Sequence, residues 1–119
     1  MFDNLYNLVK DHLNERLFDP ENLELIKQIM EKLVNMTVNL QVNSDSQYDH
    51  NNESVLRIMS ASYVGGKISI KTTTRDLGFH AVGFIITAQK DHIMITAPNS
   101  EEMGSMLIMI ITREDNPST

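Results

Sequence analysis

The chain is 119 residues long, 41% hydrophobic, free of cysteine and acidic, with a formal net charge of −6. This length suits one domain with one core, and the acidic balance with scattered basic residues argues against a nucleic-acid binder, which gathers Lys and Arg on one face. Without cysteine there are no disulfides or zinc–thiolate sites, and without an apolar run of roughly 20 residues we expect no membrane insertion and a soluble protein made in a cytoplasm.

The first predicted element is an amphipathic helix from Phe2 to Leu17. Its apolar residues recur at steps of three and four and form one stripe: Phe2, Leu5, Tyr6, Val9, Leu13 and Leu17. This period predicts a helix with one buried side. Asp19–Pro20 then ends the helix and opens a second one, because Asp is a favoured N-cap and Pro fits the first helical position.

The second predicted helix starts near Pro20 and carries a heptad-like seam. The seam alternates at steps of three and four, with Thr37 in its one polar slot, and its apolar residues are Leu23, Ile26, Met30, Leu33 and Leu40. A second apolar row widens this side, which suits docking on the chain's own domain or a bundle of several chains. From Val38 to Val42, however, apolar and polar residues alternate as in a strand. We assign residues 1–42 to a helical segment that anchors the chain or holds an oligomer together.

A polar, turn-prone stretch at residues 43–53 predicts a linker to a β domain at residues 54–113. There, Val55–Tyr63 and Lys67–Thr72 predict a hairpin, because Gly65 and Gly66 supply the positive φ angles of a two-residue turn. The polar residues 114–119 predict a flexible tail.

The remaining β elements follow a turn that Gly78 and Gly83 flank. The predicted strands are Val82–Ala88, Ile93–Ala97 and Ser105–Thr112. The last strand is apolar on both faces, which predicts burial within a sandwich or at a subunit interface through Met106, Ile108 and Ile110. The expected fold is α+β, with two N-terminal helices followed by a small antiparallel β-sandwich-like domain.

No residue pattern indicates chemistry. The four histidines, His12, His50, His80 and His92, lie far apart and lack metal-ligand spacing. Gly65–Gly66–Lys67 lacks the long spacing and the following Ser or Thr of a phosphate loop, and no serine lies in a glycine-flanked nucleophile turn. We therefore expect no catalytic residue, no metal and no cofactor, and a protein that is not an enzyme.

One stretch resembles a known family. Leu77–Gly78, then Val82–Gly83–Phe84 and the aliphatic strands after them, resemble a small β-module of tail and fibre-type virion proteins of tailed bacteriophages, over about residues 67–113. Asp76 and Ala81–Val82 stand where that module often has histidine and proline. The resemblance implies a structural component of a virion that forms a symmetric oligomer, often a trimer, and contacts other virion proteins, with the helices as a stem.

Two other hypotheses remain open. A small adaptor or regulatory protein would bind its partner through the amphipathic helix at residues 20–40, in a groove of that partner. An enzyme or ligand-binding β-barrel would need a polar pocket, which the sequence does not indicate. An adaptor would stay monomeric or dimeric until its partner is added, whereas a virion subunit would form a stable symmetric oligomer.

Overall fold

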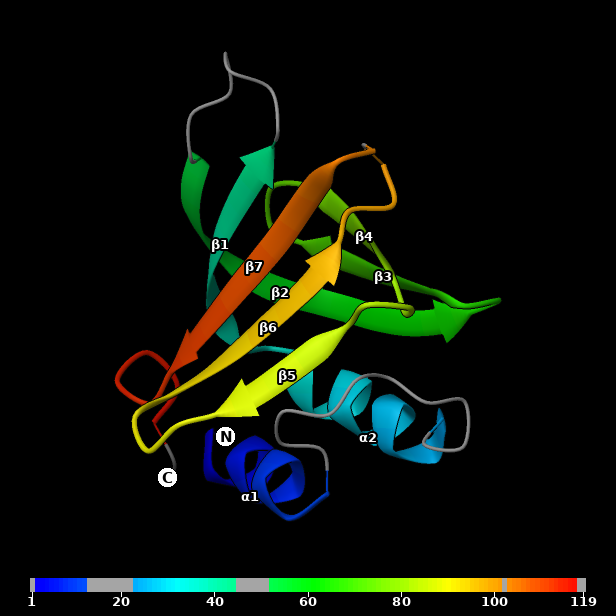
Figure 1. The fold of residues 1–119 in the computed structure, drawn as a ribbon. Coiled ribbons are helices and arrows are strands. Elements are labelled where there is room, and N and C mark those ends of the chain that lie inside the picture. The colour runs from blue at the N-terminus through cyan, green and yellow to red at the C-terminus, as the bar shows by residue number, and fades with distance from the viewer. Residues whose placement is uncertain (1, 13–22, 45–51, 102, 118–119) are drawn as a thin grey trace.

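The computed structural model describes residues 2–12, 23–44, 52–101 and 103–117, which form two helices followed by an antiparallel sheet (Figure 1). The α+β prediction is confirmed at this level. The elements are α1 (Phe2–His12), α2 (Leu23–Leu33), β1 (Thr37–Ser44), β2 (Asn52–Val64), β3 (Lys67–Thr72), β4 (Asp76–His80), β5 (Ile85–Ala88), β6 (His92–Pro98) and β7 (Ser105–Thr112). The seven strands follow the order β4-β3-β2-β1-β7-β6-β5.

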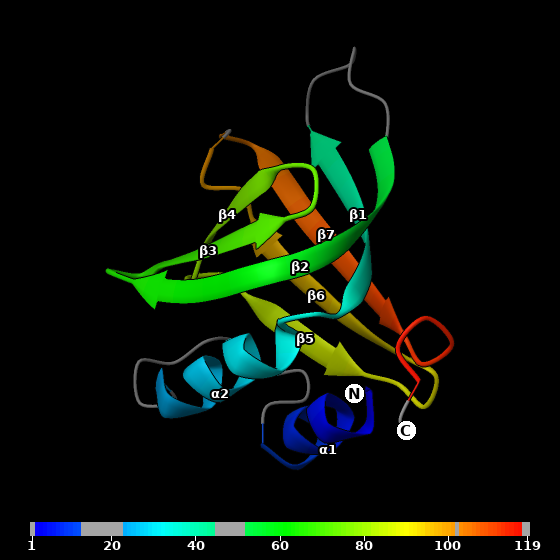
Figure 2. The ribbon, with the colours of Figure 1, turned by 180° about the vertical axis from the view of Figure 1, so that it is seen from behind.

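The sheet is strongly curled because β2 belongs to both of its halves. The first part of β2 pairs with β1 and the second part pairs with β3, with a register shift between Ile58 and Ser60. Such a bulge bends a strand and increases its twist. As a result, β2, β3 and β4 lie behind β1, β7, β6 and β5 in Figure 1 and in front of them in the reverse view of Figure 2, and the inward sides of the two halves enclose the core. The predicted hairpin is confirmed, since Gly65 and Gly66 join β2 to β3 at φ angles of 61° and 81°.

The two helices lie together at one end of the curled sheet (Figures 1 and 2). α1 packs beside β5 and α2 packs beside β2, and the helices also contact each other. Their fully or almost fully buried residues are Phe2, Leu5, Val9, Ile26, Ile29, Met30 and Leu33. The amphipathic stripe of each helix therefore covers the chain's own core.

The second helix ends at Leu33, earlier than the seam predicts. The predicted helical segment at residues 1–42 is therefore too long. After Leu33 the chain turns at Asn35, whose φ of 74° lies in the left-handed region that asparagine tolerates at a helix end. The backbone N–H of Asn35 donates to the carbonyl of Ile58 at 2.8 Å, and the chain then enters β1. Since β1 lies between β2 and β7, residues 37–42 belong to the sheet and not to a helical segment. Residues 13–22 and 45–51, which hold the end of the first predicted helix and most of the predicted linker, lie outside the described residues.

A second correction concerns the predicted turn around Gly78, which is the strand β4. The N–H of Ser100 donates to the Gly78 carbonyl at 3.0 Å, and Phe79 forms a β-bridge with Asn99. A Cβ on Gly78 would overlap Ser100 Oγ and lie 2.8 Å from Glu101 Oε1. The connection between β6 and β7 therefore lies directly on β4, and a larger residue at position 78 would have to displace the ends of the Ser100 and Glu101 side chains.

The glycine–phenylalanine pair of the same motif also has a packing role. Gly83 has a φ of 91°, and a Cβ there would lie 2.9 Å from Pro98 Cγ. Phe84 and Leu77 are buried in the core. The motif behind the resemblance thus holds β4 and the start of β5 against the end of β6.

The predicted flexible tail is wrong for residues 114–117, because Asn116 is only 2% exposed. Its Oδ1 accepts from the N–H of Thr37 at 2.7 Å, and its Nδ2 donates to the carbonyls of Thr37 (2.8 Å) and Thr112 (3.0 Å). The N–H of Phe2 donates to the Asn116 carbonyl at 3.3 Å. One side chain therefore ties the C-terminal turn to β1 and β7, and its backbone ties it to α1.

We expect Asn116→Ala to lower the free energy of unfolding by about 2 kcal/mol, because the N–H and carbonyl of Thr37 lose their partners in a partly buried place. Urea denaturation measures this change. Asp115→Ala is the matched control, since Asp115 is exposed and its hydrogen bond to Thr112 uses the backbone N–H. Equal stabilities of the two variants would contradict this role of Asn116.

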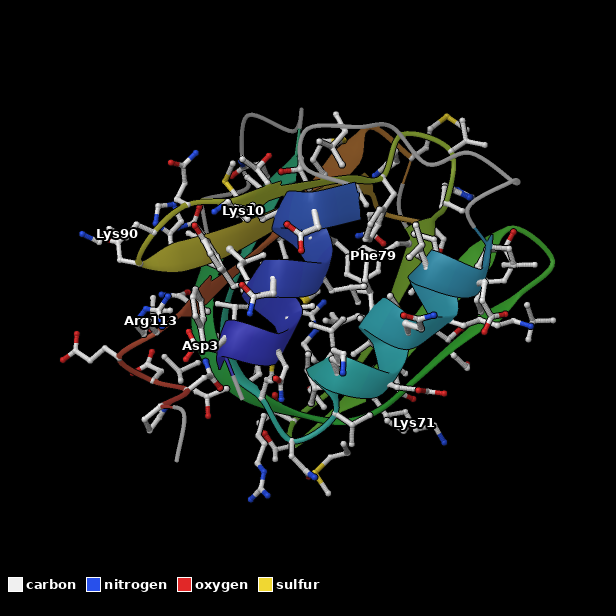
Figure 3. All side chains as sticks on the ribbon, turned by 90° about the horizontal axis from the view of Figure 1, so that it is seen from below. Asp3, Lys10, Lys71, Phe79, Lys90 and Arg113 are labelled. Atoms are coloured by element: carbon white, nitrogen blue, oxygen red, sulfur yellow. The ribbon has the colours of Figure 1, made fainter. Side chains whose placement is uncertain are left out.

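Arg113, at the start of the C-terminal turn, also contacts the start of α1 (Figure 3). Its guanidinium carbon lies 4.4 Å from the ring centre of Phe2, and its Nη1 pairs with Asp3. Its Nη2 donates to the carbonyl of Lys90 at 3.1 Å. The start of α1, the β5–β6 connection and the end of β7 are thereby held together.

Candidate assembly surface

One side of the sheet is left uncovered by the residues that the structure describes. We call it the outward face: the side chains of β1, β7, β6 and β5 that point away from the core. Strand alternation and register define its members as Thr37, Asn39, Gln41, Asn43, Met106, Ile108, Ile110, Thr112, His92, Met94, Thr96, Pro98, Ile85 and Thr87. None of them is Asp, Glu, Lys or Arg. In a chain with a net charge of −6, these four strands carry no fixed charge on this side, and Arg57 of β2 lies beside Thr37 at its edge.

The centre of the outward face is apolar. Ile110 of β7 pairs with Met94 of β6, and Ile108 pairs with Thr96, which in turn pairs with Ile85 of β5. Met94 is 37% exposed, and the isoleucines are half-buried by their neighbours in the sheet. Contiguous apolar patches rimmed by polar residues mark interaction sites on soluble proteins.

The sequence predicts two interface groups, one on β7 and one along the helical seam. The structure places the β7 group on the outward face and buries most of the seam inside the chain. Met106, Ile108 and Ile110 lie side by side along the outward side of β7. The seam residues Ile26, Met30, Leu33 and Leu40 are at most 3% exposed within the chain itself, and Leu40 belongs to β1; only Leu23 is half-buried. The fold therefore does not support the predictions that the seam joins subunits or that the helix at residues 20–40 binds in a partner's groove.

An open pocket of about 590 Å³ hollows one end of the outward face. Its lining combines four outward residues with the adjoining turns: His92, Met94, Ile110 and Thr112, then Asp91, Arg113 and Glu114. At the rim, Nδ1 of His92 lies 2.8 Å from Oδ1 of Asp91, and this hydrogen bond holds the pKa of the Asp91 carboxyl below its usual value. The pocket offers an apolar recess that a partner's side chain could fill.

A row of amides borders the apolar centre, and the sequence interpretation missed it. Asn39, Gln41 and Asn43 point outward from β1, and Asn39 lies directly beside Ile110. The Oδ1 atoms of Asn39 and Asn43 are buried and have no hydrogen-bond partner among the residues that the structure describes. The alternation from Val38 to Val42 is the signal that could have placed these amides on a strand.

An ion pair lies away from the outward face, where the β6–β7 connection meets β3. Nζ of Lys67 lies 3.2 Å from Oε1 of Glu101, and the hydrogen bond from Lys67 is the main reason why the pKa of Glu101 lies below its usual value. Both side chains are largely exposed, so the pair contributes little to the stability of the contact between β3 and the β6–β7 connection.

We expect Lys67→Met to raise the pKa of Glu101 toward its ordinary value, because the donor that favours the carboxylate is removed. A carboxyl with a lowered folded-state pKa stabilises the fold above its unfolded pKa and loses this contribution as the pH falls through its folded pKa. The variant should therefore lose part of the acid-side dependence of stability. Carboxyl-detected NMR titration measures the pKa, with Lys71→Met as the control; an unchanged Glu101 pKa in Lys67→Met would contradict the pairing.

Other signals remain separate. In the described ranges, no three His, Asp or Glu side chains gather as metal ligands, and no helix is long and apolar enough to cross a membrane. His50 and the side chain of His12 lie outside what the structure describes. Comparisons with protein-family models, with curated proteins and with solved structures find no match.

Proposed function

We propose that this chain is a non-enzymatic structural subunit that assembles into a symmetric oligomer through its outward face. The observation that carries this proposal is a sheet face with an apolar centre and with no Asp, Glu, Lys or Arg in β1, β7, β6 and β5, on a chain of net charge −6. Copies that share a negative charge repel each other, so self-association favours a surface that is free of charge. Burial of apolar area then drives the association.

The finer features of the proposal extend the same idea. A second sheet packed on the outward face would give a β-sandwich, here formed between chains and not within one. The resemblance of residues 67–113 to a phage β-module supports a place in a virion, beside other virion proteins. The buried glycine motif on β4 and β5 would then serve the subunit's own fold, and β6 and β7 would serve its assembly.

The absolute mass of the full chain in solution tests this proposal. Light scattering coupled to size exclusion, over a range of loading concentrations, should give a mass that is a multiple of the 13.6 kDa chain. A single-chain mass at every concentration would overturn the proposal. Co-sedimentation with phage particles tests the place in a virion separately, and its absence would leave self-assembly standing.

A further inference from the structure

We propose that two copies meet across a two-fold axis near Gln41, with Asn39 of each copy hydrogen-bonded to Asn43 of the other; this inference rests on the proposed self-assembly. The starting observation is the pair of buried Oδ1 atoms of Asn39 and Asn43 on the outward face, for which the described residues supply no hydrogen-bond donor. Leaving a buried acceptor unsatisfied costs about 1–3 kcal/mol, so each such atom requires an explanation. A second copy of the chain supplies the missing donors.

The chemistry of the amides favours a copy of this chain over a different partner. An asparagine side chain offers both a donor and an acceptor, so it can pair with another asparagine. A row of carboxylates or ammonium groups could not pair with itself in this way. The apolar centre next to the row, formed by Ile108, Ile110 and Met94, is equally able to pack against its own copy.

Symmetry and dimensions fix which residues meet. Asn39 and Asn43 lie two residues to either side of Gln41, so a two-fold axis at Gln41 brings Asn39 opposite Asn43 twice. Sheets that pack face to face lie about 10 Å apart, which two extended asparagines span when their amides are about 2.9 Å apart. The terminal torsion of asparagine is broad, so each amide can turn its Oδ1 toward the partner.

The size of the contact predicts its strength. The strands β1, β7, β6 and β5 have eight, eight, seven and four residues. At the usual strand dimensions they give a footprint of roughly 450 Å², near half of the roughly 800 Å² that each partner buries in a standard interface. We therefore expect a dimer that dissociates on dilution. The polar row would make only a small part of the binding energy, and its main effect would be to select one register of the two sheets, as buried polar residues do in other assemblies.

Cysteine cross-linking tests the register, because the chain has no cysteine of its own. The reagent is a short bis-maleimide, because the roughly 10 Å between packed sheets separates the backbones and leaves the facing thiols closer together than that. Gln41→Cys should link to itself, and a mixture of Asn39→Cys and Asn43→Cys should link far better than Asn39→Cys alone. In Asn39→Cys alone, the two thiols of a dimer are offset by four residues along the strand, which adds about 13 Å to their separation.

The outcomes separate this inference from the proposed function. A wild-type chain that associates but whose Gln41→Cys variant gives no self-link would overturn the two-fold contact and leave self-assembly standing. A wild-type chain that stays monomeric overturns both. Adding Asn39→Leu and Asn43→Leu to Gln41→Cys should keep the dimer mass but lower the yield of the link, because the register is no longer selected; an unchanged yield would overturn the role of the amides.

Discussion

Ile108→Asp is expected to weaken self-association at least about 100-fold. Ile108 lies on the outward side of β7 between Met106 and Ile110, with Gln41 and Thr96 beside it on the neighbouring strands. The substitution therefore places an unpaired carboxylate within the contact. Desolvating such a charge costs several kcal/mol, and each 1.4 kcal/mol changes the dissociation constant tenfold. Sedimentation velocity at matched concentrations measures the shift from oligomer to monomer.

Val82→Asp is the matched control for this substitution. Val82 is 81% exposed and lies between β4 and β5, outside the outward face. The same chemical change there should leave the oligomer intact, and circular dichroism should show that both variants fold. An oligomer that survives Ile108→Asp would move the interface to another surface.

Phe79→Ala is expected to lower the free energy of unfolding by about 3–5 kcal/mol, the usual cost of removing a buried phenylalanine. Phe79 is fully buried in β4, and its backbone forms the bridge to Asn99. Domains of this kind are stable by about 5–15 kcal/mol, so the loss is a large part of the total. Guanidinium denaturation of the Ile108→Asp background would measure it without a contribution from assembly.

Phe79→Leu, made in the same background, is the control because it keeps an apolar side chain in the site. We expect it to lose clearly less stability than Phe79→Ala, since less volume is left empty. Similar losses in the two variants would show that the ring itself, and not the filled volume, is what β4 requires. A loss below about 1 kcal/mol for Phe79→Ala would contradict the buried position of β4.

The class of the fold could be predicted from the sequence because its strongest signals are local. The stripe of α1 and the Gly65–Gly66 hairpin depend on near neighbours, and both are present. β1 was hidden because Leu40 continues the helical spacing of Leu33 by coincidence. Tertiary pairing of β1 with β2 and β7 decides in favour of the strand.

Two other features depend on contacts between distant residues, which local patterns do not contain. Leu77–Gly78 predicts a turn, whereas the structure places Gly78 in β4, where the side-chain ends of Ser100 and Glu101 approach it. The polar residues around Asn116 predict a flexible tail, although the side-chain amide of Asn116 forms hydrogen bonds with the backbone of Thr37, 79 residues earlier in the chain. Both residues join segments that meet only in the complete fold.

The candidate surface was half predictable. The doubly apolar β7 predicts apolar residues on both sides of the strand, and alternation assigns Met106, Ile108 and Ile110 to the same side, where the structure shows them half-buried. The helical seam also predicts a subunit interface, because an amphipathic stripe has the same pattern whether it covers its own domain or another chain. The packing of the helices against the sheet, which the sequence does not contain, shows that the seam is buried within this chain.

Methionine methyl groups provide the most direct measurement of which surface the oligomer buries. Met94 and Met106 lie on the outward face, whereas Met103 is fully exposed in the β6–β7 connection. In ¹³C-methyl-methionine NMR with a soluble relaxation agent, we expect Met94 and Met106 to become protected as the protein concentration rises, while Met103 stays accessible. Unchanged accessibility of Met94 and Met106 across an association that the mass confirms would contradict assembly through the outward face.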